Sequence, residues 1–594
     1  MLARRFLTLL LIIVSAVLLF WRLDGAYLWR DETTTANWAR LMSESGSGLP
    51  RVFDGRQLAV QADDGHDASS KLLPAMQSWL QFYVSAASFR LLGVSDFSAR
   101  IPYAIFGALS LWLLYRIGTL LFGPGVLALM LPALAVTSVH FLNAARQGRY
   151  YIIVVAAACW LLLEFCRYLR DPDLARQRSF YIRLGLAGLL MYCSNYVSFA
   201  GMWTALGAFV LLQRDGRLLR GFLVLSCPMA VIVGLDFWLL HSEFAGQWPP
   251  PAAGSVWARY RTGLTNRTRD FWRMVPLIFV VPAAFYLVRR HAGRLHPALT
   301  AGLTLASFLV LSPVLLSYEA RDLSGLSSPV FWLGAALCLS VPLSLAWCWK
   351  IIKQPGVWTR AALLGALVAV ISAAVAIGAG KEQASPRHYY QFLPAAVLLT
   401  SLATAGLTRA AGRKPAIAFL VGALLWPTLD FNQGCCDQVV ESQFFRDNSY
   451  NGPFVDFLRE NIQPGDKVAF YRNVKGMVAY FYLPEMHWVA LLNSDAPHNQ
   501  QFRGVIPDDQ FDDYEGVDWY VLWDPRGNRP RGLSEENYEL VWEYEYPYRL
   551  GWWDRHIDPP RRKYEIYRRR EGAPTGGPSA ARQRQRSETP FLVD

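Results

Sequence analysis

The chain has 594 residues, of which 53% are hydrophobic and 14% aromatic, and its formal net charge is +12. A soluble enzyme of this length is rarely so apolar, and the mean hydropathy of +0.19 argues against one. No basic motif of a nucleic-acid-binding fold is present, so the surplus of arginine indicates membrane-flanking loops and anionic headgroups, and no nucleic-acid partner is expected.

Apolar stretches of about 16 to 22 residues recur along the chain, separated by short charged loops. Backbone groups in lipid must be satisfied within their own segment, so each stretch is expected to form a helix. The first runs from Phe6 to Trp21, and Arg4-Arg5 before it place the N-terminus in the cytoplasm. The fold expected is an all-α polytopic membrane bundle of about thirteen transmembrane helices. The other spans are expected near 101–122, 125–142, 150–167, 183–195, 197–213, 220–241, 274–289, 297–316, 330–349, 359–378, 390–408 and 415–429.

Residues 72–92 are moderately apolar and rich in Trp, Phe and Tyr. Counting them as a span would reverse the side of every later loop and spoil the agreement with the positive-inside tendency. They are therefore interpreted as a helix that lies in the membrane interface.

The composition divides the chain into a transmembrane domain at 1–430, a small extracytoplasmic α/β domain at 431–570 and a disordered tail at 571–594. The tail is rich in Gly, Pro, Ser and Arg and has too few apolar residues to build a core. In the α/β domain, the residue patterns predict a helix at 453–461 and strands at 467–471, 517–523 and 563–567.

An acidic pair, Asp31-Glu32, lies just outside the first apolar segment, and Thr33 to Met42 can form a short amphipathic helix. Carboxylates at a membrane boundary are well placed to take a proton from an acceptor, so both are candidate catalytic residues. The alternative is that Asp31 only caps the helix, with Glu32 in its first turn.

Cations recur on the predicted outer side, against the positive-inside tendency. Arginine binds phosphate oxygens in a fork, so these cations are candidate phosphate ligands. A snorkelling lysine and structural ion pairs are the alternatives. Neighbouring side chains are candidates for substrate contact, although an ordinary interfacial histidine is the alternative for His388. The phosphate-binding candidates are Lys71, Arg146, Arg149 and Arg387, and the substrate-binding candidates are Tyr150, His388 and Tyr389.

The eight cysteines show no C-x-x-C pair and no zinc spacing, so no metal ligands are assigned. The loop 53–67 is acidic and could hold a hard cation, but a solvated acidic loop is favoured because the spacing is irregular. No cofactor is expected, and a requirement for a divalent cation is left open.

Four blocks of residues recur in a characteristic order. They are Asp31-Glu32-Thr33 with Ala39-Arg40-Leu41-Met42, Arg100-Ile101-Pro102 with Phe106-Gly107-Ala108-Leu109-Ser110 and Leu121-Phe122-Gly123, Arg146 to Tyr151, and Arg387 to Pro394. Together they resemble GT-C-type glycosyltransferases, in particular lipid A aminoarabinose transferases and protein O-mannosyltransferases. The resemblance implies a sugar donor on a polyprenyl phosphate and an active site at the outer membrane face. It also implies that Asp31 is the catalytic base and that Lys71 and the arginines contact the donor phosphate.

The function expected is transfer of a sugar from polyprenyl phosphate to a hydroxyl of a lipid, glycan or protein. It would take place in a bacterial cytoplasmic membrane, with the active site and the C-terminal domain in the periplasm. A lipid or polysaccharide transporter or flippase is the alternative, and it would need charged residues along a path across the bilayer. A structural or sensory membrane protein is the third hypothesis.

Overall fold

The computed structural model describes two compact units, and each is described by itself. The helical unit comprises the described residues of 1–21, 103–238 and 248–431. The mixed unit comprises those of 22–102 and 432–594. Described are residues 2–236, 238, 356–378, 392–411, 417, 420–421 and 451–573, except 47, 60–70, 75–76, 472–475, 493–496, 512–513, 515, 524–529, 531 and 548–560.

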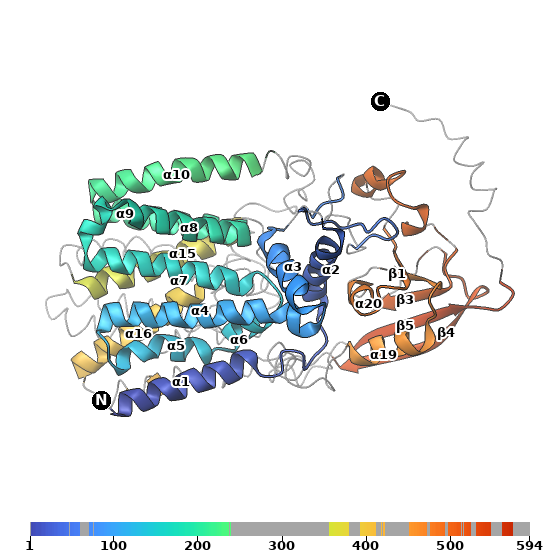
Figure 1. Ribbon diagram of the computed structural model, residues 1–594, viewed down its shortest axis with the longest axis horizontal. Coiled ribbons are helices and arrows are strands. Elements are labelled where there is room, and N and C mark those ends of the chain that lie inside the picture. Colours follow the sequence, from blue (N-terminus) through green and yellow to red (C-terminus); the bar gives the residue numbers. More distant parts are fainter. Residues whose placement is uncertain are drawn as a thin grey trace, which may run out of the picture. The chain divides into compact units, whose positions relative to one another are not determined.

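The helical unit is built from apolar helices, most of which lie beside one another with roughly parallel axes (Figure 1). Helix α4 starts in the mixed unit and enters this one at Tyr103. The helices are α1 Leu2–Phe20, α4 Asp96–Phe122, α5 Val126–Val136, α6 Val139–Arg146, α7 Tyr151–Arg170, α8 Arg178–Ser194, α9 Tyr196–Gln213, α10 Gly216–Asp236, α15 Val357–Gly378 and α16 Phe392–Ala411.

Four helices among the described residues are long and apolar enough to cross a membrane, namely α4, α7, α9 and α10. A fifth is counted if the bent pair α5 and α6 forms one span. The span count of about thirteen stays a prediction. The expected spans at 274–289, 297–316 and 330–349 and nearly all of 415–429 lie outside the described residues.

The span expected at 125–142 is not one straight helix. The axis bends by 69° between α5 and α6, because Ser138 adopts an extended conformation (φ −76°, ψ 120°) and starts a new helix. The Leu142 N–H bonds to the Ser138 carbonyl at 3.0 Å, so a new helical turn begins there. Helix α6 ends at Arg146, one of the candidate cations.

Helix α7 is the most buried of the four long apolar helices. Of the residues in its apolar stretch, 89% are buried, whereas the buried share in α10 is 17%. The buried carboxylate of Glu164 in α7 binds Arg167 at 2.6 Å and Arg183 of α8 at 3.0 Å. A charge inside a bundle is tolerated when it is paired in this way.

The mixed unit contains a five-stranded sheet in the order β2-β1-β3-β5-β4. Strand β1 pairs in parallel with β2 and β3, and β5 pairs antiparallel with β3 and β4. The elements are α2 Arg30–Ser45, α3 Leu80–Leu92, α19 Gly452–Asn461, β1 Lys467–Tyr471, α20 Gly476–Tyr482, β2 His487–Ala490, β3 Trp519–Trp523, β4 Tyr538–Pro547 and β5 Arg561–Arg569.

One hydrophobic core joins α2 and α3 to this sheet. Trp38 and Phe82 belong to the same buried cluster as Phe454, Phe470 and Tyr564, and the rings of Phe454 and Tyr564 stack at 4.9 Å. Segments near the N-terminus therefore fold with the C-terminal sequence. The proposed boundary at residue 430 separates sequence regions that this core brings together.

The helix expected in the interface at 72–92 is shorter than predicted. Helix α3 has 13 residues, from Leu80 to Leu92, and at about 1.5 Å per residue it spans only about 20 Å. A bilayer core of about 30 Å needs roughly twenty residues, so α3 is too short to cross alone.

Candidate active site

The acidic pair occupies the first turn of α2. Trp29 is the N-cap residue, and its N–H donates to Oε2 of Glu32 at 3.1 Å. The alternative interpretation took Asp31 as the cap, but the N-cap is Trp29, and Asp31 lies with Glu32 in the first turn. Acidic side chains in a first turn also complement the positive end of the helix dipole. Gly46 ends α2 in the left-handed conformation, with φ +63°.

Glu32 is bound from the other side by Arg100 of α4. Nε and Nη2 of Arg100 donate to the two carboxylate oxygens, each at 2.8 Å, in a fork. Nη1 donates to the carbonyls of Leu23 and Ala26 at 2.8 Å, and Nη2 donates to that of Tyr27 at 3.2 Å. These five bonds match the five donors of a guanidinium.

Both carboxylates of the pair are buried, and the partners of Glu32 indicate its role. The side chain of Glu32 is 1% exposed, and both of its oxygens bind Arg100. Asp31 is 9% exposed. Removing one partner of a buried, hydrogen-bonded pair is costly, so the geometry around Glu32 suits holding the turn in place better than exchanging protons.

Lys71 is exposed in a turn of the mixed unit. The next residue, Leu72, has a positive φ of +57°, and its carbonyl accepts from the Val52 N–H at 3.1 Å. The turn is thus tied to the loop after α2.

Two of the candidate arginines lie at the junction of α6 and α7 in the helical unit. Arg146 is 1% exposed. Its Nη1 donates to the Leu18 carbonyl at 2.9 Å and its Nη2 to the Trp21 carbonyl at 2.8 Å. The last carbonyls of a helix have no partner within it, so Arg146 caps the end of α1.

Arg149 has a different environment. It is 7% exposed and lies over the rings of Tyr150 and Tyr151, at 5.5 and 6.0 Å from their centroids. The two rings meet edge to face at 4.6 Å. Arg149 is held in a tight turn, because its N–H bonds to the Gln147 carbonyl at 2.7 Å. Aromatic contacts of this kind orient a guanidinium.

Arg387, His388 and Tyr389 lie outside the described residues. So do residues 60–67 of the acidic loop. Asp54 of that loop is described, and its Oδ2 accepts from the Tyr480 hydroxyl at 2.7 Å. Among the described residues, no group of three or more His, Cys, Asp or Glu side chains is placed to hold a metal ion.

The structure places Asp31, Glu32 and Lys71 in the mixed unit, and Arg146, Arg149 and Tyr150 in the helical unit. The candidate list omitted Arg100 and Tyr482, which bind the segment around Asp31. Arg100 stands at the start of an apolar segment, where an unexplained cation is a usable signal. Tyr482 has no local signal, because its partners are far away in the sequence.

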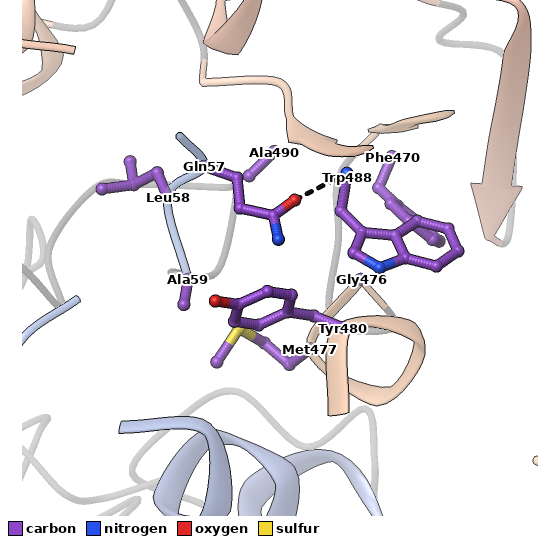
Figure 2. A pocket seen from close by; sticks show the side chains of 9 residues that line it. All are labelled: Gln57, Leu58, Ala59, Phe470, Gly476, Met477, Tyr480, Trp488 and Ala490. Atoms are coloured by element: carbon purple, nitrogen blue, oxygen red, sulfur yellow. Dashed lines mark hydrogen bonds between the residues drawn. The ribbon is translucent and has the colours of Figure 1, made fainter. Parts of the chain in front are cut away.

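A small pocket in the mixed unit is lined by none of the candidate site residues. It lies between residues 57–59, helix α20 and strands β1 and β2 (Figure 2). The Gln57 carbonyl oxygen Oε1 accepts from the Trp488 N–H at 2.7 Å across it. This contact joins the loop after α2 to strand β2.

Comparison with known protein families identifies a match in the middle of the sequence. Residues 76–235 match the family described as dolichyl-phosphate-mannose-protein mannosyltransferase. The match covers α3 to α10 with Arg100, Arg146 and Arg149. It confirms the resemblance to polyprenyl-phosphate-dependent glycosyltransferases over this part of the chain. The match covers only this part of the chain, and several helices within it are long and apolar enough to cross a membrane.

No curated protein sequence matches the chain. Among solved structures, the chain is similar to ArnT from Cupriavidus metallidurans bound to undecaprenyl phosphate, with 15% identity, a TM-score of 0.43 and coverage of 96% of this chain and 99% of that one. The apo structure of the same protein gives 16% identity, a TM-score of 0.43 and coverage of 95% and 98%. The Archaeoglobus fulgidus oligosaccharyltransferase in complex with Zn and sulfate gives 12% identity, a TM-score of 0.44 and coverage of 87% and 68%.

Proposed function

We propose that this protein transfers a sugar from a polyprenyl phosphate to a hydroxyl of a lipid, glycan or protein at the outer face of a bacterial cytoplasmic membrane. The observation that carries the proposal is the family match over residues 76–235. Its members are described as acting with a sugar on dolichyl phosphate, which is a polyprenyl phosphate. The matched residues include the buried arginines at the start of α4 and at the α6–α7 junction.

Asp31 is the proposed catalytic base. It stands in the first turn of a helix whose start is held by the Glu32–Arg100 pair, and a base is effective when its position is restrained. Glu32 was a second candidate base, and we now propose a positioning role for it because both oxygens bind Arg100.

Arg149 is the proposed contact for the donor phosphate, with Lys71 and Arg387 as further candidates. The leaving group is a phosphate, so the reaction needs stabilisation of negative charge more than a strong acid. Tyr150 and Tyr151 orient the Arg149 guanidinium. Arg146, originally a phosphate candidate, binds the end of α1, and we propose that it supports the neighbouring turn. His388 and Tyr389 remain candidates for substrate contact.

The proposed step is a single displacement. The acceptor oxygen forms a bond to the anomeric carbon of the sugar, and the bond from that carbon to the phosphate oxygen breaks. The phosphate leaves with the electron pair, the hydroxyl proton passes to Asp31, and the anomeric configuration inverts. No atom changes its oxidation state in this step, so the reaction needs no oxidant or reductant.

Incubation of the purified protein with a panel of labelled polyprenyl-phosphate sugars tests this proposal. We expect label to leave the polyprenyl phosphate and appear on an acceptor. Asp31→Asn should lower the turnover by roughly 10²- to 10⁴-fold while donor binding survives. Glu44→Gln is the matched control, because that carboxyl lies at the far end of the same helix and is 60% exposed.

Normal turnover by Asp31→Asn would remove Asp31 from the mechanism. Label that changes side of the membrane but stays on the polyprenyl phosphate would contradict transfer and favour the flippase alternative.

A further inference from the structure

The end of α20 binds the backbone just before the acidic pair. The Tyr482 hydroxyl accepts from the Leu28 N–H at 2.6 Å and donates to Oδ1 of Asp96 at 2.6 Å. Burial, and after it the neighbouring Asp96 carboxylate, raises the pKa of Tyr482 well above its usual value. The hydroxyl therefore stays protonated and keeps its donor role at physiological pH.

A second side chain from the C-terminal sequence binds the same residue. Nδ2 of Asn451, at the start of α19, donates to the Leu28 carbonyl at 3.0 Å. Leu28 is fully buried, and both of its backbone polar groups are bound by side chains more than 400 positions away. The Tyr27 ring also meets the Tyr482 ring edge to face at 4.8 Å.

Helix α20 also contacts helix α2 directly. Nδ2 of Asn37 donates to the Met477 carbonyl at 2.7 Å. Nη1 of Arg40 donates to the Phe481 carbonyl at 3.2 Å, and its guanidinium lies 4.5 Å from the centre of the Tyr480 ring. At about 100° per residue, Asn37 and Arg40 lie roughly 240° and 180° round the helix from Asp31. Helix α20 therefore contacts the side of α2 that faces away from Asp31.

The two sets of contacts meet at the first turn of α4. The Asp96 carboxylate accepts a hydrogen bond from the Tyr482 hydroxyl. Arg100, one helical turn later, donates two hydrogen bonds to the carboxylate of Glu32. Asp96 and Arg100 lie four residues apart and so share one face of α4. The segment from Leu28 to Glu32 is therefore fixed at its start by α19 and α20 and at its end by Arg100.

We propose that Tyr482 is a positioning residue for Asp31, so that the C-terminal part of the chain takes part in the reaction by setting where the base stands. The inference rests on the proposed function, because it concerns the same base. It assigns to the C-terminal sequence a role beyond that of an appended domain.

Tyr482→Phe tests this in the full-length protein. The variant keeps the ring against Tyr27 and removes only the hydroxyl. We expect kcat for sugar transfer to fall roughly tenfold to a hundredfold, because small displacements of a catalytic group have effects of this size. The KM for the polyprenyl-phosphate donor should not change. Amide hydrogen exchange of residues 28–32 should become at least about tenfold faster, since Leu28 loses its acceptor.

Tyr538→Phe is the matched control. Its hydroxyl is also buried and donates to a backbone carbonyl, that of Val517, at 2.8 Å, but both residues belong to the C-terminal sequence. It should lower the thermal midpoint about as much as Tyr482→Phe and leave kcat and the exchange of residues 28–32 unchanged. Asn451→Ala should reproduce the Tyr482→Phe result from an independent contact.

Unchanged exchange of residues 28–32 in both Tyr482→Phe and Asn451→Ala would overturn the inference, whatever the activity. So would an equal loss of kcat in Tyr538→Phe. If the wild type transfers no sugar, the proposed function fails, yet the exchange measurement still decides whether Tyr482 holds the segment.

Discussion

At the scale of single residues, the structure gives a positioning role to one carboxylate of the acidic pair. Both carboxylate oxygens of Glu32 accept hydrogen bonds from Arg100, and one of them also accepts from the N–H of the N-cap residue Trp29. Arg100 in turn distributes its remaining donors among three carbonyls of the segment from Leu23 to Tyr27. One guanidinium thus binds both the first turn of α2 and the segment that precedes it.

Arg100→Lys is predicted to destabilise the protein despite keeping the charge. An ammonium has three donors and no planar fork, so Glu32 and at least one carbonyl would lose a partner. Breaking a buried pair of this kind typically lowers the free energy of unfolding by about 3–5 kcal/mol. Because lysine keeps the positive charge, we expect a loss at the lower end of this range. Thermal unfolding of the purified protein measures it.

Arg459→Lys is the control for this substitution. Its partner Asp456 lies 3.5 Å away, and both side chains are about half exposed, at 51% and 54%. An exposed pair contributes at most about 1 kcal/mol. Equal shifts of the unfolding midpoint for the two variants would contradict the role given to Arg100.

At the scale of elements, polar side chains determine how the ends of helices and strands are held. Arg146 caps α1, and Ser138 breaks an apolar run into α5 and α6. At the start of the parallel strands, Lys467 of β1 and His487 of β2 both lie 3.3 Å from Oδ2 of Asp509. This cluster ties a buried carboxylate to the sheet edge.

The cluster predicts a dependence of stability on pH. Burial acts to raise the pKa of Asp509, but the interactions with His487 and Lys467 outweigh it and lower the pKa below its usual value. A lowered pKa in the folded state stabilises the protein above the unfolded value of about 3.9, and this contribution disappears as pH falls through the folded value. Unfolding midpoints measured from pH 6 down to pH 3 should therefore fall most steeply below about pH 4.

Asp509→Asn should remove this acid-sensitive component and make the curve flatter below about pH 4. The exposed neighbour Asp508 is the control, and Asp508→Asn should leave the shape of the curve unchanged. A wild-type curve that is flat in this range would contradict the prediction.

At the scale of the whole molecule, segments near both ends of the chain share one core. Trp38 and Phe82 lie in the same buried cluster as residues of β1, β3, β5 and α19. Leaving out the C-terminal sequence would expose large apolar side chains and remove the partners of Leu28, Asn37 and Arg40. The mixed unit is therefore a single folding entity made from two distant stretches.

A truncation after residue 431 is predicted to abolish sugar transfer and to make residues 22–102 sensitive to protease, because α2 and α3 lose their core. Limited proteolysis of the membrane-embedded protein, followed by mapping of the cleavage sites, measures this. A truncation after residue 573, which removes only the predicted disordered tail, should leave both properties unchanged. Protection of residues 22–102 in the shorter protein would show that they fold alone.

Local patterns in the sequence were informative where structure is locally determined. Apolar runs predict α7, α9 and α15 within a few residues, because a helix in lipid satisfies its own backbone. Alternating and aromatic residues predict β1, β3 and β5. Strands β2 and β4 were missed, since β2 is only four residues long and β4 alternates Glu with aromatic residues in a way that an exposed loop also could.

The sequence by itself provided the apolar segments, the acidic pair outside the first of them, the arginine-rich junction and the resemblance to polyprenyl-phosphate-dependent glycosyltransferases, because composition and short motifs carry that information. Only the tertiary structure decided that Glu32 is bound by Arg100, 68 residues away, and that Leu28 is bound by Tyr482, 454 residues away. Hydrogen bonds between such distant groups form only when a shared core has brought them together, and no local pattern of residues contains that distance.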